Sequence, residues 1–355
     1  MHLLSLGTSN PPNRFTQAEC WNAVRISRAW AALRPRSKII LRTVLNNPNG
    51  IRQRYLALDN LSEAFETDPD TMCKRFALWA PKLATQAAQN AMDESGLVPD
   101  HIDGLIVSSH TGYLCPGLTS YVSERLHLRG DICLLDLVGQ GCGAALPSLR
   151  TASALLDSGQ CDAVLSICVE VCSAAFYLDD DPGVLISACL FGDGAAAAIL
   201  TRNPAPGRRR VEWLLSETQF DPKHRDSLGF QHRGGLLRTV LSASVPEIVA
   251  KNMKIVLAQV LKRSGIAQND ISAWVFHTGG NQVLKALRHR LGLCEKDTES
   301  SVSILNDYGN MSSPSVLYVL KEQLAQQPQG GLWFLASFGA GFSAHGALLN
   351  VSVRP

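Results

Sequence analysis

Apolar and polar positions alternate along the chain in two patterns, one typical of buried strands and the other of amphipathic helices. Short apolar runs bounded by turn residues predict strands, and apolar positions three or four apart predict helices. Strands are predicted at 3–6, 104–109, 132–138, 163–169, 195–200 and 273–276. Helices are predicted at 17–33, 144–156 and 81–95, the last of them ended by Gly96. Strands that alternate with helices in this way predict an α/β fold.

The second half of the chain repeats the first half in order and spacing. A Ser-Gly turn and the apolar positions after it occupy 95–107 and recur 169 positions later, at 264–276. The Phe-Gly-Asp-Gly run at 191–194 matches Phe-Gly-Ala-Gly at 338–341. Two fused copies of one strand–helix unit predict a layered, pseudo-symmetric fold.

The repeat also predicts a boundary and a meeting point. The segment 203–210 combines two prolines, a glycine and three arginines, so it is the predicted linker. The N-terminal half is then 1–204, which contains Cys142, and the C-terminal half is 205–355, which contains His277 and Asn310. Equivalent positions should face each other across the pseudo-two-fold axis. These pairs are Ser108 with His277 and Cys142 with Asn310.

Composition excludes several classes of function. The 355 residues are 46% hydrophobic and 18% charged, which is typical of a globular protein with a large core. A net charge of +2 predicts no general affinity for nucleic acid or membrane surfaces. The ten cysteines are scattered without paired spacing, which favours reduced thiols over disulfides or a zinc site. Neither a signal sequence nor an apolar run of membrane-spanning length is recognisable, so we expect a cytoplasmic protein without a membrane span.

One stretch departs from this charge balance. Between Trp21 and Leu58 there is no acidic residue, and the eight basic residues are Arg25, Arg28, Arg34, Arg36, Lys38, Arg42, Arg52 and Arg54. Such a run is usually a solvated helix face. The alternative is a landing surface for phosphate groups at the mouth of a site, and the sequence leaves both open.

Cys142 lies where an apolar strand ends in glycines and a helix is predicted to begin. A thiol at a helix N-terminus has a lowered pKa because oriented N–H groups favour the thiolate. His277 follows the predicted strand 273–276, and Asn310 precedes another predicted helix start. Each has an ordinary alternative: a buried structural cysteine, a structural histidine and a helix-capping asparagine. Together, the three residues predict one site.

The chemistry that suits this trio is acyl transfer followed by carbon–carbon bond formation. A Cys142 thiolate paired with a His277 imidazolium attacks a thioester and retains the acyl group. His277 and Asn310 then donate hydrogen bonds to the thioester oxygen of a malonyl unit as it loses carbon dioxide. Asn310 suits this role better than an aspartate, because a carboxylate would repel the forming oxyanion.

Several runs of the chain resemble the type III polyketide synthases, the superfamily of chalcone and stilbene synthases, in their bacterial form. These runs are Gly7 to Pro12, Gln140 to Cys142, Leu190 to Ala196, His277 to Gly280, Tyr308 to Ser313 and Ser337 to Gly341. The resemblance implies a thiolase-like fold with a duplicated αβαβα five-layer core and mixed sheets. It also implies a homodimer, an acyl-CoA starter and malonyl-CoA as coenzyme A thioester substrates, and no bound cofactor or metal.

The resemblance also assigns substrate-binding residues and a product class. It implies that Phe191 is a gatekeeper of the cavity and that basic residues of the 21–58 stretch receive coenzyme A phosphates. A second gatekeeper phenylalanine falls on Thr239. The other implied substrate-binding residues are Cys172, Ala175, Ser312, Ala340 and Cys115, the last of which would reach into the partner's cavity or be a buried loop thiol. The small side chains at these cavity-lining positions favour a fatty acyl starter and an alkylpyrone or alkylresorcinol product.

Three alternatives stay open at this point. A β-ketoacyl-acyl-carrier-protein synthase of the initiating kind shares the trio but condenses once. A hydrolase using Cys, His and Asn would release a free acid. A catalytically silent scaffold partner would not react at Cys142 at all.

Overall fold

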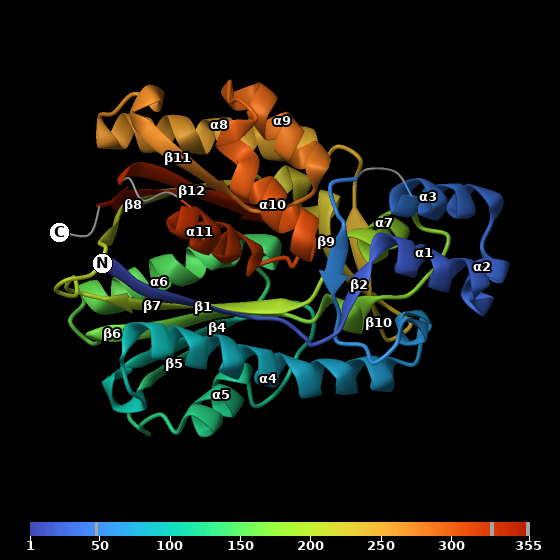
Figure 1. Ribbon diagram of the computed structural model, residues 1–355, viewed down its shortest axis with the longest axis horizontal. Helices are drawn as coiled ribbons and strands as arrows, with labels where there is room; N and C mark the ends of the chain where they lie inside the picture. The colour runs from blue at the N-terminus through green and yellow to red at the C-terminus, as the bar shows by residue number, and fades with distance from the viewer. Residues whose placement is uncertain (47–48, 327–329, 353–355) are drawn as a thin grey trace.

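Five layers of helices and sheets make up the computed structural model, which describes residues 1–46, 49–326 and 330–352 (Figure 1). One outer layer holds α4 (Pro69–Ser95) and α5 (Leu118–Leu126), and the other holds α8 (Val245–Ser264) and α9 (Asn281–Leu291). The central layer holds α6 (Ala145–Asp157) and α11 (Ser315–Gln326). A half-sheet fills the space on each side of the central layer. The predicted five-layer α/β fold is therefore confirmed.

The two half-sheets have the same internal order. The full order is β11-β12-β13-β8-β1-β7-β6-β4-β5, in which the described strands give β5 no counterpart in the C-terminal half-sheet. The half-sheets join where His2 of β1 pairs with Glu212 of β8 and the Trp213 N–H donates to the Met1 carbonyl oxygen. The N-terminal strands are β1 (His2–Ser9), β4 (Gly104–Ser108), β5 (Cys133–Leu137), β6 (Ala163–Glu170) and β7 (Gly194–Thr201). The C-terminal strands are β8 (Val211–Phe220), β11 (Ile271–Phe276), β12 (Gly331–Gly339) and β13 (Ser343–Val351).

Strand direction repeats as well. β4 runs parallel to β6, and β11 runs parallel to β12. The next pair in each half-sheet, β6 with β7 and β12 with β13, is antiparallel. The chain crosses from one half to the other between β7 and β8. The boundary at 204/205 lies in this connection and stays a prediction.

The core lies on both faces of each half-sheet. The central helices bury Leu146, Leu149, Val316 and Leu320 between the two half-sheets. On the far side of the N-terminal half-sheet, α4 approaches the backbone of β1 closely, because a Cβ at Gly7 would lie 2.0 Å from the Ala87 carbonyl oxygen. Small residues thus let the helix and the sheet pack at short range.

Two predicted helices differ in extent from those observed. The predicted 17–33 helix is broken into α1 (Gln17–Ile26) and α2 (Arg28–Ala32), because Ser27 is extended and its side chain accepts a hydrogen bond from the Trp30 N–H. The predicted 81–95 helix begins earlier, at Pro69, where Asp68 accepts from the Thr71 N–H. Its predicted end is right, since Gly96 caps it in the left-handed conformation.

The remaining elements pack beside the layers near the carboxyl ends of the strands (Figure 1). They are α3 (Pro35–Asn46), α7 (Pro182–Leu190), α10 (Glu299–Tyr308), β2 (Arg14–Thr16), β3 (Gln53–Tyr55), β9 (Leu228–Arg233) and β10 (Leu236–Leu241). The helix predicted to start at Asn310 starts at Ser315, because 310–314 forms a tight turn in which Ser312 has a φ of 63°. Within the described ranges, no helix is long and apolar enough to cross a bilayer.

Candidate active site

Cys142 lies in a one-turn helix, Gly141–Gly143, between the end of β5 and the start of α6. The turn needs backbone freedom, since Gly139 and Gly141 have φ values of 81° and 57°. The Cys142 side chain is buried, with 8% of the residue exposed. The predicted strand–helix junction is thus correct, with one tight turn inserted before α6.

The end of β12 packs directly on this turn. A Cβ at Gly339 would lie 2.4 Å from the Gly143 nitrogen, so only glycine fits there. The Ser337 hydroxyl donates to the Gly143 carbonyl oxygen at 2.9 Å. The Phe338 ring meets the His277 ring edge-on, with centroids 4.9 Å apart. The Ser-Phe-Gly motif therefore fixes Cys142 and His277 relative to each other.

His277 follows β11 and is completely buried. Its backbone N–H donates to the Ala336 carbonyl oxygen at 3.0 Å, which fixes the chain where the strand ends. Among the described residues, neither ring nitrogen has a hydrogen-bond partner of good geometry. This buried imidazole interacts with the Cys142 thiol, and a ring nitrogen beside the nucleophile is suited to binding a substrate oxygen.

Asn310 is held between the two halves. Its N–H donates to the Leu190 carbonyl oxygen, and its own carbonyl oxygen accepts from the Gly192 N–H, both at 3.0 Å. The side-chain Oδ1 accepts from the Ser312 N–H at 2.8 Å. Because Oδ1 is occupied in this way, the Nδ2 amino group is the end of the amide that can donate to a substrate.

Three further polar residues complete the surroundings of Cys142. The Ser312 hydroxyl donates to Cys142 Sγ at 2.9 Å and lies 3.0 Å from His110 Nε2. His110 Nδ1 forms an ion pair with Glu170 Oε1 at 2.6 Å. Sequence reasoning placed Ser312 only through the family resemblance, and it missed His110 and Glu170.

A signal for His110 exists in the sequence. Ser108 is the repeat partner of His277, so the residues that follow β4 reach the same place as those that follow β11. His110 is a titratable residue at the carboxyl end of a strand, where α/β folds place their sites. Glu170 ends the neighbouring strand β6, which runs parallel to β4.

The electrostatics favour a charged sulfur. Burial raises the pKa of the Cys142 thiol, but the nearby imidazoles of His110 and His277 outweigh it and lower this pKa to about 6. Burial alone would lower the pKa of His110, yet the Glu170 carboxylate and Cys142 raise it to about 10. At neutral pH the site therefore holds a thiolate beside an imidazolium. The lowered pKa was expected from the helix N-terminus and from pairing with His277, whereas the contribution of His110 was not expected.

Cys142 opens into a cavity of about 420 Å³. Phe191, Thr239 and Ala340 line it, as predicted for substrate-binding residues. Cys172 packs in the same apolar cluster as Cys142 and Phe191. Ala175 is buried outside the lining, and Cys115 is exposed. Bulky side chains that the sequence analysis did not single out also line the cavity, namely Tyr113, Leu228, Phe230 and Leu237.

The basic stretch is divided in its roles. Arg54 is buried and donates to the carbonyl oxygens of Ala188 and Phe191, both at 2.7 Å. Arg34 and Arg52 pair with acidic residues. These two arginines are exposed, and so are Arg25, Arg28, Arg36 and Arg42. Arg54 therefore has a structural role, and no described residue of this stretch lines the Cys142 cavity.

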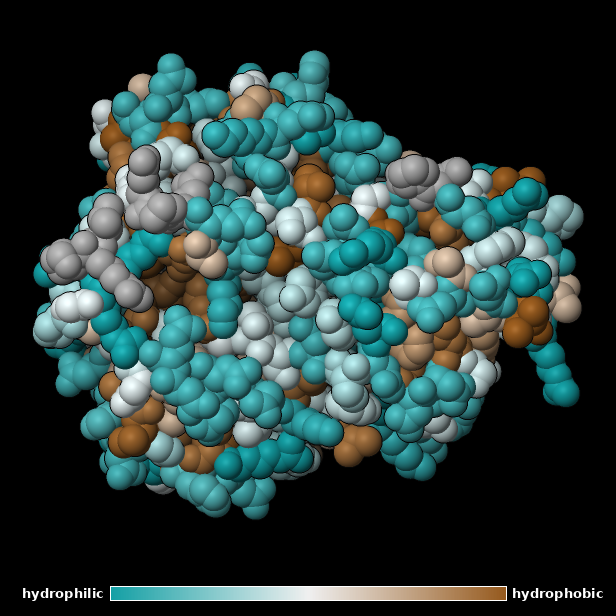
Figure 2. Space-filling model, viewed as in Figure 1, coloured by the Kyte–Doolittle hydropathy of each residue, from teal (hydrophilic) through white to brown (hydrophobic). Residues whose placement is uncertain are grey.

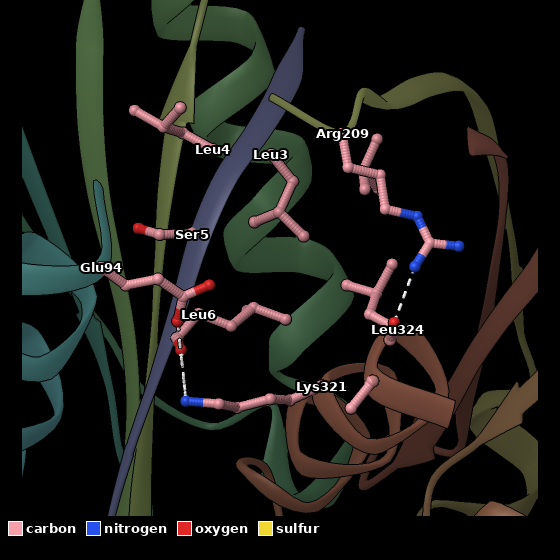
Figure 3. A pocket seen from close by; sticks show the side chains of 10 residues that line it. Leu3, Leu4, Ser5, Leu6, Glu94, Arg209, Lys321 and Leu324 are labelled. Atoms are coloured by element: carbon pink, nitrogen blue, oxygen red, sulfur yellow. Dashed lines mark hydrogen bonds and ion pairs between the residues drawn. The ribbon is translucent and has the colours of Figure 1, made fainter. Parts of the chain in front are cut away.

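A second hollow lies on another face, between β1 and α11 (Figures 2 and 3). Its floor is formed by leucines such as Leu3 and Leu6. Lys321 donates to the Leu6 carbonyl oxygen at 2.7 Å and pairs with Glu94. It is lined by no cysteine or histidine, so the Cys142 cavity is the better candidate for chemistry. The described residues also contain no cluster of three side chains able to hold a metal.

Comparisons with known proteins agree along the whole chain. A model of the FAE1/type III polyketide synthase-like family matches residues 41–219, and a model of the chalcone and stilbene synthase C-terminal domain matches residues 214–351. A 1,3,6,8-tetrahydroxynaphthalene synthase from Streptomyces peucetius subsp. caesius is 30% identical over 348 residues, which cover 97% of this chain and 91% of that protein.

Solved structures show the same architecture. PKS-I from the brown alga Ectocarpus siliculosus has a TM-score of 0.87 and 27% identity, with 98% of this chain and 97% of that chain covered. The 1,3,6,8-tetrahydroxynaphthalene synthase from Streptomyces coelicolor A3(2) has a TM-score of 0.90 and 23% identity, with 99% and 100% covered. At 23% identity, the similarity to the S. coelicolor enzyme shows a shared fold alone.

Proposed function

Because the chain belongs to the type III polyketide synthase family, whose members are acyltransferases acting on coenzyme A thioesters without a bound cofactor, we propose that Cys142 is its acyl-carrying nucleophile. The Cys142 thiolate attacks the thioester carbonyl of an acyl-CoA starter, the bond to the coenzyme A sulfur breaks, and the acyl group stays on Sγ. The observation that supports this most directly is the position of Cys142 at the cavity beside two imidazoles, which lower the pKa of its thiol to about 6.

His277 and Asn310 stabilise the second half-reaction. Malonyl-CoA loses carbon dioxide, and negative charge develops on its thioester oxygen. One ring N–H of His277 and the Nδ2 group of Asn310 donate to this oxygen. The resulting enolate attacks the acyl carbon on Cys142, which forms the carbon–carbon bond and releases the thiolate. Repetition of these steps in one cavity gives a poly-β-keto chain that then cyclises.

Two product classes are candidates: a compact aromatic product and a product that carries a long alkyl chain. Bulky Phe230, Tyr113 and Leu237 around a volume of about 420 Å³ favour a compact aromatic product built from malonyl units, and the relative from S. peucetius carries the name of a naphthalene-forming synthase. A separate apolar pocket lined by Phe176 has a volume of only about 30 Å³. A long acyl chain would therefore have to displace side chains there.

The second candidate is the fatty acyl starter with an alkylpyrone or alkylresorcinol product. Small residues favour it, because Cys172 lies beside Cys142 and Thr239 replaces a phenylalanine of the plant enzymes. Of the two, we favour the compact product.

One set of incubations tests both proposals. Purified enzyme receives malonyl-CoA alone and with a series of acyl-CoA starters of two to sixteen carbons, and products are identified by mass spectrometry. Cys142→Ala should abolish all products. Preference for starters of eight or more carbons would select the second candidate. One malonyl unit per product and dependence on acyl carrier protein would instead indicate the single-condensation enzyme.

We also propose a homodimer and a cytoplasmic location. The outer edge of β5 has no partner strand within the described ranges, and Leu134 and Val138 beside it are 43% and 63% exposed. An unpaired apolar edge strand is a natural site for pairing with a second copy. Leu134→Lys should give a monomer in sedimentation, and a wild-type monomer would contradict the proposal. All ten cysteines lie in the described part of the chain as free thiols, as in a reducing compartment.

A further inference from the structure

The outer layer of the C-terminal half, formed by α8 and α9, carries a strong excess of positive charge. The two helices pack against each other at the surface of the molecule, over the C-terminal half-sheet (Figure 1). Their one acidic residue is Glu247. Their seven basic residues are Lys251, Lys254, Lys262, Arg263, Lys285, Arg288 and Arg290. Since the whole chain has a net charge of only +2, the rest of it is acidic on balance.

The fold itself does not require this charge. The outer layer of the N-terminal half, α4 and α5, has the equivalent position over the other half-sheet (Figure 1). Acidic and basic side chains are balanced there. The acidic ones are Asp70, Asp93, Glu94 and Glu124, and the basic ones are Lys74, Arg75, Lys82 and Arg125. Two layers with the same packing task thus differ in charge, so packing alone does not account for the excess on α8 and α9.

Ion pairs offset only the arginines of the C-terminal layer. The pairs are Arg263 with Glu217, Arg288 with Glu295, and Arg290 with Glu247. The four lysines have no ion pair, hydrogen bond or ring contact among the described residues. All four are exposed, and they are Lys251, Lys254, Lys262 and Lys285. Their charges are therefore available to a partner.

Three of these lysines form one stripe along α8. Lys251, Lys254 and Lys262 occur at positions that share a face of a helix, and this face points to solvent because the opposite face is buried. From the first lysine to the last, the stripe spans about 16 Å of the helix. The three side chains, together with Arg290, surround an open hollow of about 520 Å³. The charges thus lie on one broad surface rather than in a deep pocket.

Such a surface fits anionic lipid headgroups better than a protein. Protein interfaces are depleted in lysine and depend on buried aromatic or other large apolar anchors. In α8 and α9, which are described throughout, the one exposed large apolar side chain is Ile255, at 37%. Bases of single-stranded nucleic acid stack on aromatic rings, and these two helices contain none. Lysines, by contrast, attract an anionic bilayer through its surface potential and need no shaped pocket.

We propose that the layer of α8 and α9 is a docking surface for membranes that contain anionic phospholipid. The stripe of Lys251, Lys254 and Lys262 faces the headgroups, and Lys285 adds charge from α9. The protein adsorbs without insertion, because Ile255 alone supplies too little apolar surface to enter the bilayer. Docking is therefore reversible and is weakened by salt. The net charge of +2 conceals this face, since the remaining surface offsets it.

The test is sedimentation of the purified enzyme with lipid vesicles. Vesicles of phosphatidylcholine alone are compared with vesicles that contain about one-third phosphatidylglycerol, at about 50 and about 300 mM sodium chloride. Wild type should bind only the anionic vesicles and should be released at the higher salt concentration. Each lysine removed weakens binding about five-fold. The triple variant Lys251→Gln, Lys254→Gln and Lys262→Gln should therefore bind about 100-fold more weakly.

The repeated architecture supplies a matched control. The triple variant Lys74→Gln, Lys82→Gln and Arg125→Gln removes the same charge from the equivalent outer layer. Its binding should stay within about three-fold of wild type, because those side chains lie on the opposite side of the molecule, beyond the range of unscreened charge. Equal losses in the two triple variants would overturn the proposal, since they would show an effect of net charge alone.

Two other outcomes would also overturn it. One is a wild-type protein that does not bind the anionic vesicles at low salt. The other is a protein that ignores vesicles yet binds poly-glutamate or a short DNA duplex through the same lysines, which would identify an acidic protein or a nucleic acid as the partner. Both triple variants should keep wild-type turnover of malonyl-CoA in solution, because none of the substituted side chains lines the Cys142 cavity. Docking and the proposed activity can therefore fail independently.

Discussion

Removing the buried Glu170 carboxylate should destabilise the protein in a way that depends on pH. The folded state raises the pKa of His110 from 6.5 to about 10, although burial acts in the opposite direction, because Glu170 in larger part and Cys142 in smaller part favour the charged ring. A group whose pKa is raised on folding stabilises the protein fully below its unfolded pKa. That contribution is lost as the pH rises through the folded pKa.

The magnitude follows from these two pKa values. Linkage gives a contribution of about 4 kcal/mol at pH 7 and about 1 kcal/mol at pH 9.5. The value at pH 7 agrees with the ~3–5 kcal/mol cost of breaking a buried ion pair by removing one partner. The hydrogen bonds from Thr111 and Ser313 add a part that does not change with pH in this range.

The assay is urea unfolding of wild type, Glu170→Ala and Glu170→Gln at pH 7 and pH 9.5. Both variants should be less stable than wild type at pH 7, and the difference should shrink by about 3 kcal/mol at pH 9.5. Glu63→Ala is the matched control, because its pair with Arg75 is longer, at 3.8 Å, and Glu63 is one-third exposed. It should cost less than about 1 kcal/mol at both pH values. A Glu170 penalty that stays constant between pH 7 and 9.5 would refute the reasoning.

Three further predictions concern the cavity and the nucleophile turn. Asn310→Asp should lower malonyl-CoA decarboxylation by ~10²–10³-fold, measured as released carbon dioxide, while Cys142 still alkylates; a rate near wild type would exclude Asn310 as a donor. Gly339→Ala places a methyl 2.4 Å from the Gly143 nitrogen, so it should lower the melting temperature and the rate of starter loading together. Phe230→Ala enlarges the cavity beside His110 and should admit longer starters or add extension cycles, visible as heavier products; an unchanged product mass would mean that Phe230 does not limit chain growth.

The sequence determined the repeated architecture and the position of Cys142, the proposed nucleophile. Apolar runs that end in glycine turns fix where strands stop, and the internal repeat places the carboxyl ends of β4 and β11 together. Cys142, His277 and Asn310 follow from these local signals, because a strand end and the helix after it are decided by residues close in the chain. The end of α4 at Gly96 is correct for the same reason.

Only the tertiary structure decided how the charges are paired. Glu170 and His110 lie 60 positions apart, at the ends of two adjacent strands, and nothing local distinguishes their ion pair from two unrelated buried residues. The same holds for Arg54, which belongs to a basic run in the sequence but is buried against two backbone carbonyl oxygens. The cavity volume also stayed hidden, because Phe230 reaches the site from a hairpin whose position depends on packing. Local sequence sets where elements begin and end, whereas burial and partner choice depend on contacts between residues far apart in the chain.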